Sequence, residues 1–319
     1  MPAVTALRHA HPEWLIGWAI EPQWRGLFCA NGGEMPLVDQ VHIVPAKRWA
    51  KSPLRVATVR DVQRVRSELR AMHYDIAVDM QGAVRSAMVA RWSKAEHVIG
   101  EAEPREFAAK WLFHERVQTR GVHVIEQSLE VASAILRERL PMTLPLLPRD
   151  PAADAMAAQI REPFVLISPG AGWGAKRWPA DRYGLVARRM ADAGYGVVIN
   201  SAPAEEHLGK EIMATSGGAA QAMALDLTEL IAVTRRAALA IAGDTGPLHL
   251  ACALNIPVVG IFGPTDPARN GPYHCRSRVL RHPGSVRDHS RRSEPEAGLL
   301  TITPDDVTAA ALELLREER

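Results

Sequence analysis

Short apolar runs alternate with longer amphipathic segments along the whole chain. This alternation is typical of βα units, in which buried parallel strands are joined by helices. In the first half, the pattern predicts strands at Trp14–Ile20, Val41–Val44, Asp75–Asp79 and His97–Gly100. It predicts helices at Arg55–Met72, Ala83–Trp92 and Val122–Arg139. The first half is therefore expected to form an α/β domain.

The chain changes character at Leu140–Pro151, where four of twelve residues are proline. Proline lacks a backbone N–H and interrupts helices, so this segment is predicted to be an interdomain linker. A second series of strands is predicted at Phe164–Ser168, Gly196–Asn200, Leu239–Gly243 and Pro257–Phe262. Helices are predicted at Pro179–Ala193 and from Thr303 onward, and an exposed loop at Pro283–Gly298. The sequence thus predicts an α/β fold of two doubly wound domains, 1–145 and 146–319, facing each other across a cleft.

Length and composition agree with this division. The 319 residues suit two domains of roughly 150 residues. Thirty-eight basic against 36 acidic residues give a net charge of +2, which offers no reason to expect nucleic-acid binding. Cys29, Cys252 and Cys275 are odd in number and widely spaced, so they predict neither a disulfide framework nor a zinc site. With no signal-peptide pattern and no apolar run of about 18 residues, we expect a cytoplasmic protein that at most rests on a membrane surface.

The strongest local motif is Gly-Asp-Thr-Gly-Pro-Leu-His-Leu-Ala at residues 243–251. An apolar strand here enters a tight turn, and a helix is predicted to begin near Pro247. Backbone N–H groups at Thr245 and Gly246 would then lie at the positive end of that helix, where anions bind. The alternative is an ordinary strand-to-helix turn, capped by Asp244, that binds nothing.

A glycine-rich loop with two cations follows the strand at 164–168. Its sequence, Ser168 to Pro179, places Lys176 and Arg177 just before a helix that begins with proline. Lysine is a compact charge suited to a diphosphate, and small residues allow close backbone approach. The glycine spacing does not fit a P-loop, which argues against an ATPase. The alternative is a loop with no ligand.

A carboxylate follows the next strand. Residues 201–206 read Ser-Ala-Pro-Ala-Glu-Glu, directly after the strand at 196–200. A carboxylate at the end of a strand can accept hydrogen bonds from both ribose hydroxyls of a nucleotide. The alternative is an acidic first helical turn that interacts with the helix dipole.

Together these motifs resemble glycosyltransferase family 9, the ADP-heptose:lipopolysaccharide heptosyltransferases. Four motifs carry the resemblance in order: Ser-Pro-Gly-Ala-x-x-x-x-Lys-x-Trp-Pro at 168–179, Pro-Ala-Glu at 203–205, Asp-Thr-Gly-Pro-Leu-His at 244–249 and Phe-Gly-Pro-Thr-Asp-Pro at 262–267. The first half is similar to heptosyltransferase I at residues 74–82, 85–87, 105–106 and 123. The resemblance implies a GT-B fold made of two Rossmann-like domains. It leaves open that the final helix, 303–317, packs back on the first domain.

The resemblance implies a donor site for ADP-L-glycero-D-manno-heptose in the second domain. Its residues are Ala171, Gly172, Lys176, Glu205, Asp244, Thr245, Gly246, Pro247, Leu248 and His249. Lys176 and the turn at 245–246 would bind the diphosphate, and Glu205 (or Glu206 in the other register) the ribose. Asp244 and His249 would lie at the sugar end.

The resemblance also implies an acceptor site in the first domain for Kdo2-lipid A. Its residues are Lys47, Arg48, Lys51, Gln81, Arg105 and His123. Clustered cations suit a polyanionic acceptor, although Lys47–Lys51 taken alone would be interpreted as a solvated loop. The expected protein is a monomer, needs no metal or other cofactor, and contacts the inner membrane only peripherally.

The family's general base has no counterpart in this sequence. The family inverts the anomeric carbon by direct displacement, with an aspartate base in a Gly-Asp pair after its first strand. Residues 1–8 instead resemble the middle of the family's first helix. Either residues upstream of Met1 exist in the natural protein, or the chain is a defective relative with an interior strand missing from its first sheet. Asp79 is the carboxylate nearest in position, and no catalytic base is assigned.

Three functions are therefore compared. The first is heptose transfer to Kdo of the lipopolysaccharide inner core. The second is nucleotide-sugar binding without turnover, because the donor motifs are present and the base is absent. The third is a dehydrogenase, which is rejected because no strand is followed by Gly-x-Gly-x-x-Gly and an acidic residue about twenty positions later.

Overall fold

The computed structural model describes residues 1–201, 205–288, 290 and 292–317. The chain forms two compact units, Met1–Pro148 and Arg149–Arg319. The boundary between them lies inside the proline-rich segment that the sequence predicts to be a linker.

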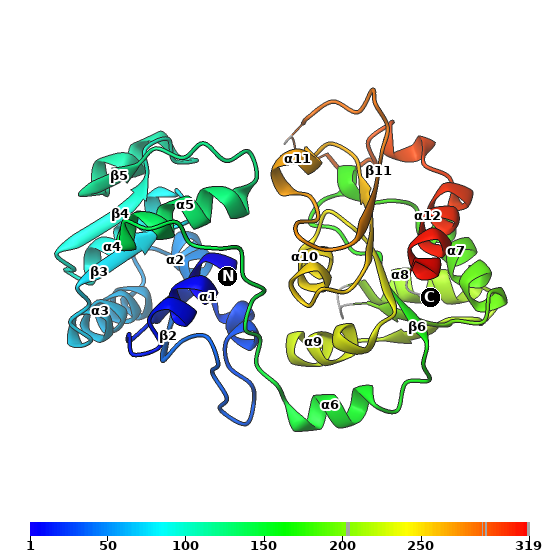
Figure 1. Ribbon diagram of the computed structural model, residues 1–319, viewed down its shortest axis with the longest axis horizontal. Coiled ribbons are helices and arrows are strands. Elements are labelled where there is room, and N and C mark those ends of the chain that lie inside the picture. The colour runs from blue at the N-terminus through cyan, green and yellow to red at the C-terminus, as the bar shows by residue number, and fades with distance from the viewer. Residues whose placement is uncertain (202–204, 289, 291, 318–319) are drawn as a thin grey trace. The chain divides into compact units, whose positions relative to one another are not determined.

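The second unit is an open, six-stranded parallel sheet with helices on both faces (Figure 1). Its strands are β6 (Phe164–Ser168), β7 (Gly196–Asn200), β8 (Gln221–Met223), β9 (Leu239–Gly243), β10 (Val258–Phe262) and β11 (Ser277–Arg281). Its helices are α6 (Pro151–Ala157), α7 (Ala180–Asp192), α8 (Glu206–Thr215), α9 (Leu227–Arg236), α10 (Gly246–Ala253), α11 (Pro267–Asn270) and α12 (Pro304–Arg316). Short 3-10 turns occupy η3 (Gly174–Lys176) and η5 (Leu299–Thr301).

The strand order is β11-β10-β9-β6-β7-β8. Two three-stranded halves thus run outward from the neighbouring strands β6 and β9, as in a doubly wound dinucleotide-binding sheet. Loops after β6 and after β9 therefore leave the same edge at the point where the winding reverses. Ligands bind at this point in such sheets.

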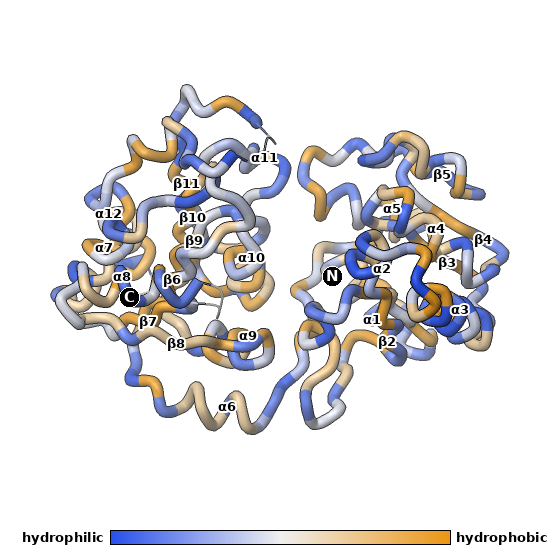
Figure 2. Tube along the Cα trace, turned by 180° about the vertical axis from the view of Figure 1, so that it is seen from behind, coloured by the Kyte–Doolittle hydropathy of each residue, from blue (hydrophilic) through white to orange (hydrophobic). Residues whose placement is uncertain are grey.

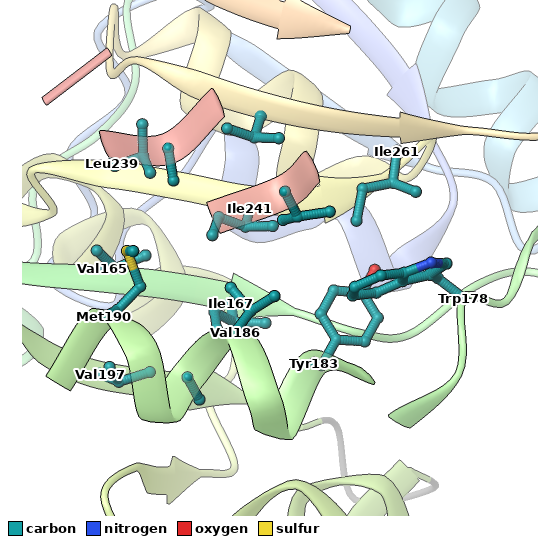
Figure 3. Packing of buried hydrophobic residues seen from close by; sticks show 14 of the residues in the cluster. Val165, Ile167, Trp178, Tyr183, Val186, Met190, Val197, Leu239, Ile241 and Ile261 are labelled. Carbon is teal, nitrogen blue, oxygen red and sulfur yellow. The ribbon is translucent and has the colours of Figure 1, made fainter. Parts of the chain in front are cut away.

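Alternate residues of the central strands pack on opposite faces of the sheet. Val165, Ile167, Leu239 and Ile241 pack against α7, whose Tyr183, Val186 and Met190 lie close by in Figure 3. Ala240 and Ala242 face the other side and pack with Leu248 of α10. Because both faces are covered, β6, β9 and β10 are buried throughout and their sequences are continuously apolar.

The final helix belongs to the second unit. Val307, Ala311 and Leu314 of α12 are fully buried in the same core as α7, and the two helices lie side by side in Figure 1. Thr303 caps α12 by accepting a hydrogen bond from the Asp306 N–H at 3.2 Å. From the sequence, this helix could have packed on the first domain. In the structure its apolar face packs against the core of the second unit.

The first unit contains shorter elements. Its strands are β1 (Gly17–Ile20), β2 (Gln40–Ile43), β3 (Ile76–Asp79), β4 (His97–Glu101) and β5 (Glu115–Val117). Its helices are α1 (Pro2–Ala10), α2 (Ala46–Lys51), α3 (Val56–Ala71), α4 (Val84–Trp92) and α5 (Val124–Leu136), with 3-10 turns η1 (Pro22–Leu27) and η2 (Phe107–Leu112). Ala3, Ala6 and Leu7 of α1 pack on Leu129 and Ala132 of α5.

These strands form two parallel sheets, β1-β2 and β3-β4-β5. Among the described residues no ladder joins the β1-β2 sheet to the β3-β4-β5 sheet. Tyr74 connects the two pieces: its hydroxyl lies 2.8 Å from His42 Nε2, and its ring lies against Gly17, where any Cβ would collide with it. Partial burial raises the pKa of Tyr74 to about 12, so the phenol is neutral at physiological pH.

Candidate functional site

Four loops in the second unit leave the same edge of the sheet. They follow β7, β6, β9 and β10, which are consecutive in the sheet, and they contain the four sequence motifs. Residues 202–204, which include part of the Pro-Ala-Glu motif, lie outside the described residues. Because all four strands are parallel, motifs far apart in sequence are brought to one edge at the reversal of winding.

Lys176, Asp244 and His249 form the charged centre of this edge. Lys176 Nζ donates a hydrogen bond to the Asp244 carbonyl at 3.1 Å and forms an ion pair with the Asp244 carboxylate. His249 Nε2 lies 3.3 Å from Asp244 Oδ1. The Lys176 and Asp244 side chains are only 11% and 8% exposed, whereas His249 is 45% exposed. A buried cation with an exposed neighbouring imidazole suits a ligand that carries phosphate and hydroxyl groups.

Asp244 is ionised because of these two partners. Burial alone would raise its pKa, but the hydrogen bonds of His249 and Lys176 and the charge of Lys176 outweigh burial. They lower the pKa from 3.8 to about 2. The ionised carboxylate therefore pairs with the Lys176 ammonium and fixes its position.

Trp173 is a site residue that the sequence analysis missed. Lys176 Nζ lies 4.3 Å from the centre of the Trp173 ring, so the ring holds the cation from a second side. The indole N–H of Trp173 is buried and has no hydrogen-bond partner among the described residues. A tryptophan three positions before the lysine, inside a glycine-rich loop, is the signal that could have revealed it.

The loop that carries Lys176 is fixed by close backbone contacts. Gly174 lies so near the Ser293 carbonyl that a Cβ at this position would overlap it. The Ala175 N–H donates to the Arg292 carbonyl at 3.1 Å, and Trp178 Nε1 donates to the Ile302 carbonyl at 3.0 Å. These contacts attach the loop that carries Lys176 to residues 292, 293 and 302.

The N-terminus of α10 is open on the same edge. Thr245 is its N-cap, yet within the described part of the chain no side chain caps the first turn. A Cβ on Gly246 or Gly172 would meet no described side chain or distant backbone atom within 4 Å. Pro247 is the second residue of the helix, and Leu248 is fully buried in the core, so only the backbone of Leu248 could contact a ligand.

Glu205 approaches the glycine-rich loop. It is the N-cap of α8, and its carboxylate lies directly against Gly170, where a Cβ would collide with it. The structure thus brings together Lys176, the turn at 244–246, Glu205 and the neighbouring Ala171 and Gly172. The alternative Glu206 instead pairs with Lys210 of its own helix at 2.8 Å.

The six residues expected to bind the acceptor lie in the first unit. Lys47, Arg48 and Lys51 are exposed on α2, and Arg48 pairs with Asp61. Arg105 lies 3.4 Å from Glu106, and its backbone approaches Gly82, next to Gln81. These side chains come from the segments that follow β2, β3 and β4.

His123 has a structural role. It is 5% exposed and is the N-cap of α5, where its Nδ1 accepts the Ile125 N–H at 3.1 Å. The Glu126 carboxylate accepts the His123 N–H in return, which completes a capping box. This capping accounts for the position of His123 without a ligand.

Both carboxylate oxygens of Asp79 accept hydrogen bonds. It is 3% exposed and accepts hydrogen bonds from the Gln81 N–H at 2.8 Å, the Gly82 N–H at 3.2 Å and Ser86 Oγ at 3.0 Å. Burial raises the pKa of its carboxyl, and these hydrogen bonds oppose the rise. The geometry is that of a residue that shapes the turn after β3.

A doubly wound sheet with a buried lysine and an open helix N-terminus at its reversal point is typical of proteins that bind phosphate-bearing ligands. A model of "Glycosyltransferase family 9 (heptosyltransferase)" matches residues 62–297. The chain therefore belongs to this family and is a glycosyltransferase.

Relatives of known kind are similar along most of the chain. The lipopolysaccharide heptosyltransferase 1 of Pseudomonas aeruginosa is 28% identical over 298 residues, which are 89% of this chain and 79% of the relative. The lipopolysaccharide heptosyltransferase 2 of Escherichia coli K12 is 25% identical over 338 residues, covering 98% and 93%.

Solved structures show the same fold. The E. coli heptosyltransferase WaaC with ADP has a TM-score of 0.81 at 22% identity and covers 98% of this chain and 94% of its own. The E. coli ADP-heptose lps heptosyltransferase II has a TM-score of 0.78 at 22% identity and covers 99% and 94%. The predicted α/β fold of GT-B type is confirmed. Separately, none of the described helices is both long and apolar enough to cross a membrane.

Proposed function

We propose that this chain transfers L-glycero-D-manno-heptose from ADP-heptose to Kdo of the lipopolysaccharide inner core, at the cytoplasmic face of the inner membrane. The observation that carries the proposal is the convergence of Lys176, the open N-terminus of α10 and Glu205 at one sheet edge. Relatives named as lipopolysaccharide heptosyltransferases, one of them solved with ADP, support the choice of sugar and nucleotide.

In the proposed reaction, positive charge stabilises the departing ADP. The Lys176 ammonium and the backbone N–H groups at 245–246 would contact the diphosphate, whose negative charge grows as the glycosidic bond breaks. The lysine would exchange part of its contact with Asp244 for the phosphate. Asp244 and His249 would then face the heptose hydroxyls, and Glu205 the ribose. These groups supply the required charge without a metal ion, and direct displacement would invert the anomeric carbon.

The protein would act as a monomer, and the acceptor would bind to its first unit. Lys47, Arg48 and Lys51 would offer cations to the Kdo carboxylates and lipid A phosphates, and Gln81, Arg105 and His123 would add further contacts to the acceptor. The acceptor hydroxyl must lose a proton to a general base. The three hydrogen bonds to Asp79 oppose that role for this carboxylate, so the proposal assigns no base.

A second candidate is a nucleotide-sugar-binding relative that does not turn over. The engagement of Asp79 and the interrupted first sheet favour it. Both candidates bind ADP, and only one releases it from ADP-heptose in the presence of an acceptor.

Release of ADP from ADP-heptose in the presence of Kdo2-lipid A is the test. We expect acceptor-dependent release, measured by a coupled ADP assay, with ADP binding by calorimetry as the control for a folded donor site. ADP binding without release would exclude the transferase and support the second candidate. If the chain neither binds ADP nor releases it from ADP-heptose, the proposed donor site is wrong.

Lys47→Ala combined with Lys51→Ala is expected to spare ADP affinity and raise the KM for Kdo2-lipid A by about tenfold or more, because charge-assisted hydrogen bonds to anions are lost. The matched control is Lys94→Ala, another lysine of the first unit, which should leave KM unchanged. If acceptor use is the same in all three proteins, the segment at 47–51 is a solvated loop.

A further inference from the structure

Residues 51–60, here called the cationic tip, present apolar side chains to solvent at the start of α3. Leu54 is 93% exposed, Val56 66% and Val59 47%. Single exposed apolar residues are ordinary, whereas exposed apolar residues that gather in one segment and are rimmed by polar ones can mark an interaction site. The exposed apolar side chains of the cationic tip therefore indicate a surface that contacts a partner.

The charges around the patch that have no ion-pair partner among the described residues are all positive. Lys51, Arg55 and Arg60 are exposed, and none of them pairs with a carboxylate of the described residues. The neighbouring acidic residue, Asp61, is occupied by Arg48. A surface that combines apolar side chains with unneutralised cations is complementary to an anionic interface with an apolar interior.

A side-chain hydrogen bond fixes the backbone conformation of the cationic tip. Thr58 Oγ1, itself buried, donates to the Ser52 carbonyl at 2.8 Å, which closes the turn that carries Leu54. Farther along α3, Val65 and Leu69 are buried against the unit. Helical spacing places Val56 on the opposite, outward face and Val59 on the flank of the helix. Figure 2 shows the rest of α3 as mostly hydrophilic.

We propose that the cationic tip inserts into the surface of an anionic lipid bilayer, with Leu54 and Val56 below the headgroups and the arginine and lysine side chains among the lipid phosphates. Long basic side chains can reach a polar interface while their stems remain in apolar surroundings. The inference rests on the proposed function only in that the proposed acceptor is itself a membrane lipid.

An exposed aromatic pair elsewhere in the first unit provides a comparison. Phe107 and Trp111 of η2 are each 67% exposed. Lys110 Nζ lies 3.5 Å from the centre of the Phe107 ring and 5.2 Å from that of Trp111, so both rings are already in contact with a cation. The apolar residues of the tip have no such cover, which favours the tip as the inserting element.

Vesicle co-sedimentation of the full chain tests the proposal. The probes are vesicles of phosphatidylcholine mixed with phosphatidylglycerol and vesicles of phosphatidylcholine alone, both free of lipopolysaccharide. We expect binding to the anionic vesicles, weakened by salt because exposed charges are screened. Leu54→Asp with Val56→Asp should lower the partition coefficient at least about tenfold, and Arg55→Gln with Arg60→Gln about tenfold as well.

The matched controls are Val286→Asp, which changes a 72% exposed residue of the second unit, and Phe107→Asp with Trp111→Asp. Both should keep vesicle binding near that of the unchanged chain, and ADP affinity should stay constant in every variant. Equal binding by the Leu54/Val56 variant and the unchanged chain would overturn the proposal, as would loss only in the Phe107/Trp111 variant. Since no acceptor or donor sugar is present, the outcome is independent of heptose transfer.

Discussion

Lys176→Ala is expected to weaken ADP binding by about 1.5–3 kcal/mol, the range for hydrogen bonds to charged groups. The structure explains why this one cation should matter. Its side chain is 11% exposed, and its ammonium lies between Asp244 and the Trp173 ring, at the edge where α10 begins. A phosphate there would meet little competing water, so the attraction is stronger than at an open surface.

Calorimetric titration with ADP measures this loss, and Arg177→Ala is the matched control. Arg177 is the next residue along the loop and is exposed, so its removal should change ADP affinity by no more than about 0.5 kcal/mol. Similar losses in the two variants would point to general charge attraction. An unchanged affinity in Lys176→Ala would remove the lysine from the phosphate site.

The central strands could be predicted closely from the sequence. Phe164–Ser168, Gly196–Asn200 and Leu239–Gly243 have the same bounds in the prediction and in the structure. Strands buried on both faces are continuously apolar, which makes them easy to recognise. The missed strands are edge strands: β8 has three residues, and β11 carries Arg278, whose partners Glu313 and Glu317 lie on α12. Nothing local in the sequence indicates such a strand.

The candidate donor site could be predicted as a set of loops but not as a set of contacts. Parallel topology is enough to bring the loops after β6, β7 and β9 to one edge. The pairing of Lys176 with Asp244 joins residues 68 positions apart, and no periodicity reports it. His123 shows another limit: the resemblance implies that it binds the acceptor, which stays a prediction, and its role as the N-cap of α5 could be seen only in the structure.

Asp244→Asn is expected to destabilise the protein by about 2–4 kcal/mol at neutral pH, because it leaves the buried Lys176 without its counter-ion. The effect should depend on pH. The pKa of Asp244 is lowered in the folded chain, from 3.8 to about 2, so the ionised carboxylate stabilises the fold above about pH 3.8. That contribution, about 2 kcal/mol, is lost as the pH falls through about 2.

Guanidinium unfolding of the full chain, at neutral pH and at acid pH down to about 2, measures the difference between wild type and Asp244→Asn. The difference in unfolding free energy should narrow below about pH 3.8, because the unfolded chain then protonates Asp244, and it should be smallest near pH 2, where the folded protein also begins to carry an uncharged carboxyl. Asp192→Asn is the control: its pair with Arg188 is more than half exposed and should contribute no more than about 0.5 kcal/mol. If the difference in unfolding free energy between wild type and Asp244→Asn is the same at neutral pH and at the acid end of the titration, packing and not charge causes the destabilisation. Adding Lys176→Ala to Asp244→Asn should recover part of the lost stability, since the unpaired cation is then gone as well.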